Sequence, residues 1–161
     1  MAPEEHIVLP SLDVVLSETK SAVDDQSARI SSLDTKLGVL LGLSGVILAA
    51  LLSFHPFYWG NIAIKQLLIA AIGLILVSLF SATWGYWIRK YKAPPDPTAL
   101  RKFYLTEEQE KTKLAIIDYL SSVYEWNQQR LANKVKCTHI SFVFVLLAAI
   151  TIGVTILLNM I

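Results

Sequence analysis

The sequence predicts an all-α membrane protein with three transmembrane helices and helical, coiled-coil-like cytosolic extensions. Three runs contain no Asp, Glu, Lys, Arg or His: residues 37–54, 67–88 and 140–158, with 18, 22 and 19 residues. A helix needs about 20 residues to cross a hydrocarbon layer of roughly 30 Å, so each run is long enough to span a bilayer. The chain is also 54% hydrophobic, above the roughly 45–50% of ordinary soluble domains.

The distribution of charge predicts the topology. Residues 1–36 carry seven acidic and three basic side chains, residues 55–66 carry only Lys65, and residues 89–139 carry ten Lys or Arg. Short basic loops stay in the cytoplasm, which predicts a cytosolic N-terminal helix over 1–36 and an external loop over 55–66. Residues 89–139 are then cytosolic, and a third transmembrane helix over 140–161 ends outside.

The N-terminal segment contains a heptad seam, with steps of four and three residues that continue into the first apolar run. The seam residues are Leu12, Leu16, Thr19, Val23, Gln26, Ile30, Leu33 and Leu37. Such a pattern is typical of a helix that packs in a bundle. We expect one helix of about 40 residues that includes the first crossing. The alternative is an amphipathic helix lying on the membrane surface, but the acidic flanks favour the bundle.

A proline-rich segment separates the second crossing from the last helix. Pro94, Pro95 and Pro97 break any helix leaving that crossing, and Asp96 or Thr98 is expected to cap a short helix that follows. From Thr106, which forms a capping box with Gln109, we predict one helix of about 55 residues that includes the third crossing. Its expected seam comprises Leu114, Ile117, Ser121, Tyr124, Gln128, Leu131, Val135 and Thr138.

Small residues lie on one side of each crossing and predict close helix packing, because they let helix backbones approach where hydrophobic drive is absent. The predicted helix-packing glycines are Gly38, Gly42, Gly45, Gly73, Gly85 and Gly153. The spacing does not distinguish packing within the chain from packing between chains.

The residue content predicts neither an enzyme nor a metal or cofactor site. His6, His55 and His139 are too scattered along the chain to meet as ligands or beside a nucleophile. The crossings hold no ionisable group, which argues against a proton-coupled transporter or voltage sensor. The net charge of +1 is not the strongly basic charge that is typical of nucleic-acid-binding proteins. Cys137 is the only cysteine; it is either a palmitoylation or redox site or, more commonly for such a residue, a small apolar side chain.

One cluster on the predicted cytosolic helix remains as a candidate ligand site. It comprises Tyr124, Trp126, Asn127, Arg130 and Lys134. Aromatic faces can stack a nucleobase, an amide can read its edge, and cations can bind phosphate. The alternative is that Arg130 and Lys134, with Lys136, are cations that extend to the headgroups beside the third crossing. Both interpretations stay open from the residues alone.

Two short motifs resemble a known family. The run Ser32 to Leu41 (SLDTKLGVLL), followed by Gly45-Val46-Ile47-Leu48, resembles the entry to the first crossing in transmembrane effectors of the bacterial Pycsar antiphage system. The pattern Leu120, Asn127, Leu131 and Lys134, leading into an apolar helix, is similar to the closing part of that family and of related SLATT-type membrane proteins. The order of helices also matches over most of the chain.

The resemblance implies a homo-oligomeric protein of the cell inner membrane that responds to a cyclic mononucleotide. On receiving this cytosolic signal, such an effector perturbs membrane integrity in abortive infection. A different class of function stays open, namely a non-enzymatic structural or assembly subunit of a larger membrane complex. In both cases the partners include the lipid bilayer.

Overall fold

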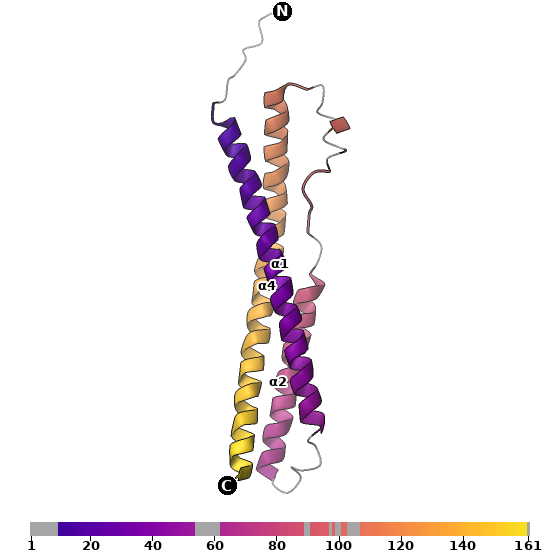
Figure 1. Cartoon of the computed structure of the whole chain (residues 1–161), viewed down its shortest axis with the longest axis vertical. Helices are drawn as coiled ribbons and strands as arrows, with labels where there is room; N and C mark the ends of the chain where they lie inside the picture. Colours follow the sequence, from indigo (N-terminus) through magenta and orange to yellow (C-terminus); the bar gives the residue numbers. More distant parts are fainter. Residues whose placement is uncertain are drawn as a thin grey trace, which may run out of the picture. The chain divides into compact units, whose positions relative to one another are not determined.

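A computed structural model describes residues 10–53, 62–88, 91–96, 98, 101–102 and 107–160. Three long helices follow one another along the chain: α1 (Leu12–Ser53), α2 (Ile62–Trp87) and α4 (Gln109–Met160) (Figure 1). The described residues contain no strand. All three helices are long and apolar enough to cross a membrane, which confirms the all-α membrane fold.

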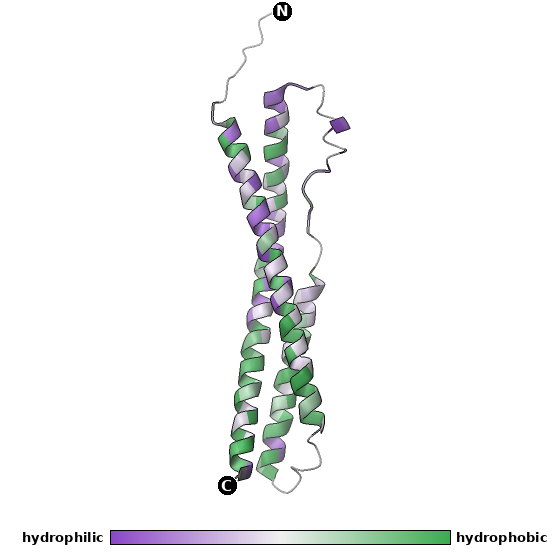
Figure 2. Ribbon diagram, in the orientation of Figure 1, coloured by the Kyte–Doolittle hydropathy of each residue, from purple (hydrophilic) through white to green (hydrophobic). Residues whose placement is uncertain are grey.

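Helices α1 and α4 each continue from a polar segment into an apolar run, as the sequence predicted. Helix α1 has 42 residues and runs from the N-terminal seam through the first apolar run without a break. Helix α4 has 52 residues and joins the basic segment to the third apolar run. Along α1 and α4 the colouring changes from mixed to predominantly hydrophobic, whereas α2 is hydrophobic along most of its length (Figure 2). The predicted cap at Thr106 lies outside the described residues.

The chain divides into two compact units. Residues up to Arg29 together with residues 90–129 form the first, here called the water-side unit. Residues 30–89 and 130–161 form the second, here called the membrane unit because it contains the three apolar runs. Helices α1 and α4 contribute to both units.

In the water-side unit, the predicted α1 seam contacts α4. Val23 packs in a small cluster with Leu120 and Val123, and Ile116 lies against it. All eight predicted seam residues of α1 are buried or half-buried, and of the other residues from 12 to 37 only Asp34 is not exposed. A regular step of three and four residues puts these side chains on one face, so the burial follows directly from the pattern.

The predicted seam of α4 is wrong in its register. Tyr124 and Val135, which were placed in the seam, are exposed, and of the eight predicted residues only Leu131 is buried. The buried positions between 120 and 134 are instead Leu120, Val123, Asn127, Leu131 and Lys134. The buried face includes an amide and an ammonium group because each has a partner elsewhere in its own unit, as described below.

The segment after α2 has no regular structure over residues 91–96, as its prolines predicted. The Asp96 carboxylate accepts a hydrogen bond from the Thr98 amide at 2.9 Å, two residues on, which is the geometry of a helix N-cap. The Asp96 side chain thus makes one of the two predicted capping contacts, whereas the amides that Thr98 would cap include residues outside the described ranges. Residues 98 and 101–102 are helical.

The membrane unit is built on small side chains. Ala71, Ala82 and Ala148 are fully buried, as are Leu37 and Ile75. Small residues at the contacts allow dispersion and hydrogen bonding between helices to act over short distances, which is how helices associate in lipid.

Candidate functional site

Asn127 is buried in the water-side unit and holds the segment that follows α2. Its Oδ1 accepts a hydrogen bond from the Lys92 amide at 2.9 Å, and its Nδ2 donates to the Lys92 carbonyl at 3.1 Å. The side-chain amide thus satisfies both backbone polar groups of one residue in a segment without regular structure. An exposed fraction of 4% leaves Asn127 no edge with which to read a base in this conformation.

Two aromatic residues of α4 extend this attachment. The Lys92 ammonium lies 4.8 Å from the centroid of the Trp126 ring, a cation–π geometry. The Tyr119 hydroxyl donates to the Ala93 carbonyl at 3.3 Å. Trp126 is nevertheless 44% exposed, so part of its ring faces solvent beside a cation.

Gln26, a polar member of the α1 seam, ties α1 to α4 within the same unit. Its Nε2 donates to the Tyr124 carbonyl and to the Gln128 Oε1, both at 3.1 Å. A buried amide with specific partners fixes the register of two helices, because shifting them would leave it unsatisfied.

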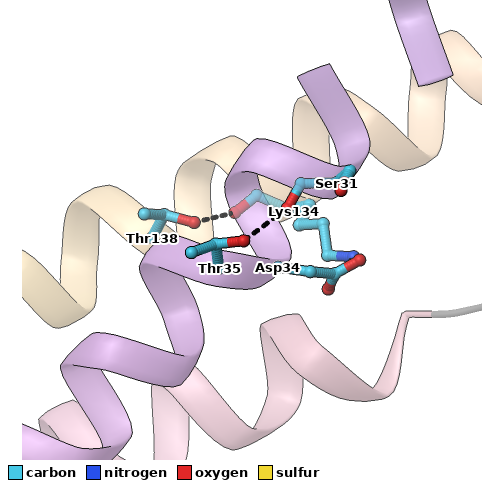
Figure 3. A network of polar contacts seen from close by, with 5 residues as sticks. All are labelled: Ser31, Asp34, Thr35, Lys134 and Thr138. Carbon is cyan, nitrogen blue, oxygen red and sulfur yellow. Dashed lines mark hydrogen bonds and ion pairs between the residues drawn. The ribbon is translucent and has the colours of Figure 1, made fainter. Parts of the chain in front are cut away.

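In the membrane unit, Lys134 forms a buried ion pair with Asp34. The Lys134 Nζ and Asp34 Oδ1 are 2.6 Å apart; the Lys134 side chain has no exposed surface and that of Asp34 is 36% exposed. Figure 3 shows the ammonium of α4 directed at the carboxylate of α1. Beside the pair, Thr138 donates to the Lys134 carbonyl at 2.9 Å and Thr35 to the Ser31 carbonyl at 3.1 Å.

The five predicted ligand residues thus divide between the two units. Tyr124 and Trp126 belong to the water-side unit and are partly exposed, and Asn127 in the same unit is engaged with Lys92. Arg130 and Lys134 belong to the membrane unit, where Arg130 is half-buried and Lys134 is paired with Asp34. Lys92 was absent from the predicted cluster. The only signal for it in the sequence is its place in a segment where basic residues outnumber acidic ones.

A hydroxyl cluster in the membrane unit was not predicted. Ser44, Ser78 and Ser141, one from each helix, have no exposed surface. The Ser78 Oγ lies 2.9 Å from the Ser141 Oγ and 3.3 Å from the Ser44 Oγ, and 3.0 Å from the Ser141 carbonyl. Each apolar run contains more than one hydroxyl, so the sequence alone does not reveal which of them meet.

Of the six predicted packing glycines, Gly85 alone makes a close approach within its own chain. A Cβ at Gly85 would lie 2.9 Å from the Cys137 Cβ and 3.2 Å from a Leu37 methyl. At Gly38, Gly42, Gly45, Gly73 and Gly153 an added Cβ would meet nothing within 4 Å. Those five positions leave room for another helix or for lipid.

The described residues contain no group of three or more His, Cys, Asp or Glu side chains that could hold a metal ion. The environment of Cys137 favours the thiol over the thiolate, because burial raises the pKa of the Cys137 thiol. A neutral thiol is a poor nucleophile. These features describe helix packing and side-chain pairing.

Comparison with known proteins identifies one family. The family model described as the Pycsar effector protein domain matches residues 18–160, nearly the whole of the described chain. No curated protein and no solved structure gives a significant match.

Proposed function

Because the chain belongs to the Pycsar effector protein family, an antiphage membrane effector family, we propose that it is an oligomeric inner-membrane protein that perturbs the membrane on a cyclic nucleotide signal. The observation that carries this proposal is the continuity of α1 and α4. Each helix contributes to the water-side unit and then to the membrane unit without a helical break. A change in how the two helices contact each other on the water side therefore bears directly on their membrane-spanning parts.

Signal binding is proposed for the water-side surface around Trp126 and Lys92. A cyclic mononucleotide combines an aromatic base with one phosphodiester charge, and the exposed Trp126 ring beside the Lys92 ammonium offers a stacking face and a cation. Tyr124 lies two residues away on α4 and is 37% exposed. Asn127, Arg130 and Lys134 continue the same helix, and binding by Asn127 or Lys134 requires exchange of a partner that each already has.

The test is dye release from proteoliposomes. Purified protein is reconstituted with an entrapped fluorescent dye, and each of the four cyclic mononucleotides is added, with the linear monophosphates as controls. We expect release with at least one cyclic nucleotide. Loss of base stacking in Trp126→Ala weakens the response about 5- to 150-fold, since stacking contributes roughly 1–3 kcal/mol per base. Trp126→Phe should retain most of it.

A matched pair of lysines tests the role of charge. Lys92→Gln should weaken the response, whereas Lys20→Gln, an exposed lysine on α1 of the same unit, should not. Release that is equal with cyclic and linear nucleotides, or none with any of them, contradicts the proposal. The absence of any release favours the alternative function, a non-enzymatic assembly subunit of a larger membrane complex.

Orientation in the membrane is the second part of the proposal: the N-terminus is cytoplasmic and the C-terminus external. In a Cys137→Ala background, cysteines are placed at Ile62, 74% exposed at the start of α2, and at exposed Asp96. In intact cells an impermeant maleimide should label position 62 and miss position 96. The reverse pattern contradicts the orientation inferred from the basic residues.

Oligomerisation is the third part, and the open glycines support it. Gly38, Gly42 and Gly45 lie at steps of four and three on α1 and have space beyond them, so a helix of a second copy could approach closely there. Gly42→Leu fills that space, and a Cβ at this position meets no other group of its own chain within 4 Å. We expect it to reduce chemical cross-linking between copies in membranes, with Gly85→Leu disrupting the fold instead. An unchanged oligomer in Gly42→Leu, Gly38→Leu and Gly45→Leu excludes this face.

A further inference from the structure

The membrane unit has a groove between α1 and α4 that carries two basic side chains where the apolar runs begin. Its volume is about 520 Å³. Lys36 on α1 and His139 on α4 are the basic side chains, and the lining on one side of them comprises Leu33, Thr35, Val135 and Thr138. Beyond them, in the direction of the apolar runs, the lining is Val39, Leu40 and Leu43 on α1 and Phe142 on α4.

The two basic side chains stand at the membrane boundary. Lys36 immediately precedes the first apolar run and His139 immediately precedes the third. Both are exposed, and among the residues that the structure describes neither makes a hydrogen bond or ion pair. The neighbouring carboxylate, Asp34, is already engaged by Lys134, so the positive charge of Lys36 is not neutralised by it.

The apolar part of the groove fits within one leaflet. From Lys36 to Leu43 the helix rises about 10 Å at 1.5 Å per residue. One leaflet contributes about half of a hydrocarbon layer of roughly 30 Å. Apolar lining of this length beside a cation matches an amphiphile with an anionic head and an acyl tail, whereas a soluble nucleotide would find no polar partner beyond the rim.

We propose that this groove binds an anionic phospholipid, with the headgroup phosphate against Lys36 and His139 and one acyl chain along Val39, Leu43 and Phe142. The ammonium donates to phosphate oxygen as a charge-assisted hydrogen bond, and the imidazole supplies a second donor. The apolar lining of the groove excludes water from the acyl chain. This site lies in the membrane unit and does not depend on how the protein senses a nucleotide.

The test is lipid titration of the purified protein in mild detergent, followed by native mass spectrometry. Phosphatidylglycerol should bind about tenfold more tightly than phosphatidylcholine. Lys36→Gln should weaken phosphatidylglycerol binding about fivefold, equivalent to about 1 kcal/mol per basic residue at a membrane surface, and leave phosphatidylcholine unchanged. Lys136→Gln is the matched control, because Lys136 is exposed on α4 near the same boundary but does not line the groove.

A second pair of variants tests the tail. Val39→Trp fills the groove from a 64% exposed position and should reduce binding of both lipids, whereas Leu147→Trp, exposed on α4 outside it, should not. Inorganic phosphate should not displace the lipid. Equal affinity for both lipids, or equal loss in Lys36→Gln and Lys136→Gln, overturns the proposal. So does a loss of oligomer in Val39→Trp without a change in bound lipid, which assigns the groove to a second copy of the chain.

Discussion

The buried ion pair between Asp34 and Lys134 predicts an asymmetric response to mutation. Asp34→Asn removes the carboxylate that is paired with an ammonium group without exposed surface, and breaking a buried ion pair by removing one charge costs about 3–5 kcal/mol of unfolding free energy. Lys134→Met removes the cation instead and leaves a carboxylate that is 36% exposed and can be hydrated. Its cost should be nearer 1–3 kcal/mol, the penalty for leaving a polar group without its partner.

The double variant completes the cycle. With both charges removed, Asp34→Asn combined with Lys134→Met should be more stable than Asp34→Asn alone, because the buried positive charge is then removed together with the carboxylate that balanced it. Unfolding free energies are measured by titrating dodecyl sulfate into mixed micelles and following circular dichroism. Lys136→Met, at an exposed lysine on the same helix, serves as the control and should change little.

Two results would refute this account. If Lys134→Met destabilises more than Asp34→Asn, the ammonium is not the buried partner that the structure shows. If the two single effects add in the double variant, the side chains are not coupled. The same variants separate stability from signal recognition. If the pair only stabilises the helices, dye release should change in both single variants. If Lys134 binds the nucleotide directly, release should be lost in Lys134→Met and retained in Asp34→Asn.

Three further predictions concern the membrane unit, including its thiol at Cys137. Gly85→Ala should destabilise by about 1–3 kcal/mol because its Cβ would lie 2.9 Å from a neighbouring Cβ, whereas Gly42→Ala should stabilise by about 0.5–1 kcal/mol, and dodecyl sulfate unfolding measures both. Ser78→Ala should cost about 0.6–1.7 kcal/mol in the same measurement, more than Thr83→Ala, whose hydroxyl bonds only to its own helix. Because burial raises the pKa of the Cys137 thiol, less thiolate is present at neutral pH than for a free thiol. The rate of its reaction with maleimide should therefore be lower than that of a free thiol, and this rate should still increase as the pH rises past about 8.5. Equal rates for the two thiols would contradict that environment.

The sequence predicted the helices well because their signals are local. An uncharged run of about 20 residues spans a bilayer whatever surrounds it. Helices α1, α2 and α4 contain the described residues of the three predicted runs, except Ile88 at the end of the second. The α1 seam was predicted correctly for a similar reason: a helix that is polar on its other faces has one stripe to bury. The periodicity alone identified Val23 and Gln26.

The α4 face could not be predicted because its burial depends on residues distant in sequence. Asn127 and Lys134 resemble surface residues until their partners are known, and the Lys92 backbone is 35 residues from Asn127. Tyr124 and Val135 resemble core residues, yet both remain partly exposed. The candidate ligand cluster includes Asn127 and Lys134 as side chains open to a ligand, so the partners that already occupy them were missed with the register.

The water-side unit has a small core, and this has a consequence for how amide hydrogens exchange with solvent. Val23, Leu120 and Val123, with Ile116 against them, form its one described cluster of buried hydrophobic residues. Burial of each such side chain contributes about 1.5–3 kcal/mol before the entropy of ordering is subtracted, so local opening of this unit is easily reached. The apolar halves of α1 and α4 differ, since in lipid an unpaired amide finds no water and the helical hydrogen bonds persist. Within a single uninterrupted helix, protection against deuterium should therefore rise steeply from the seam residues to the apolar run.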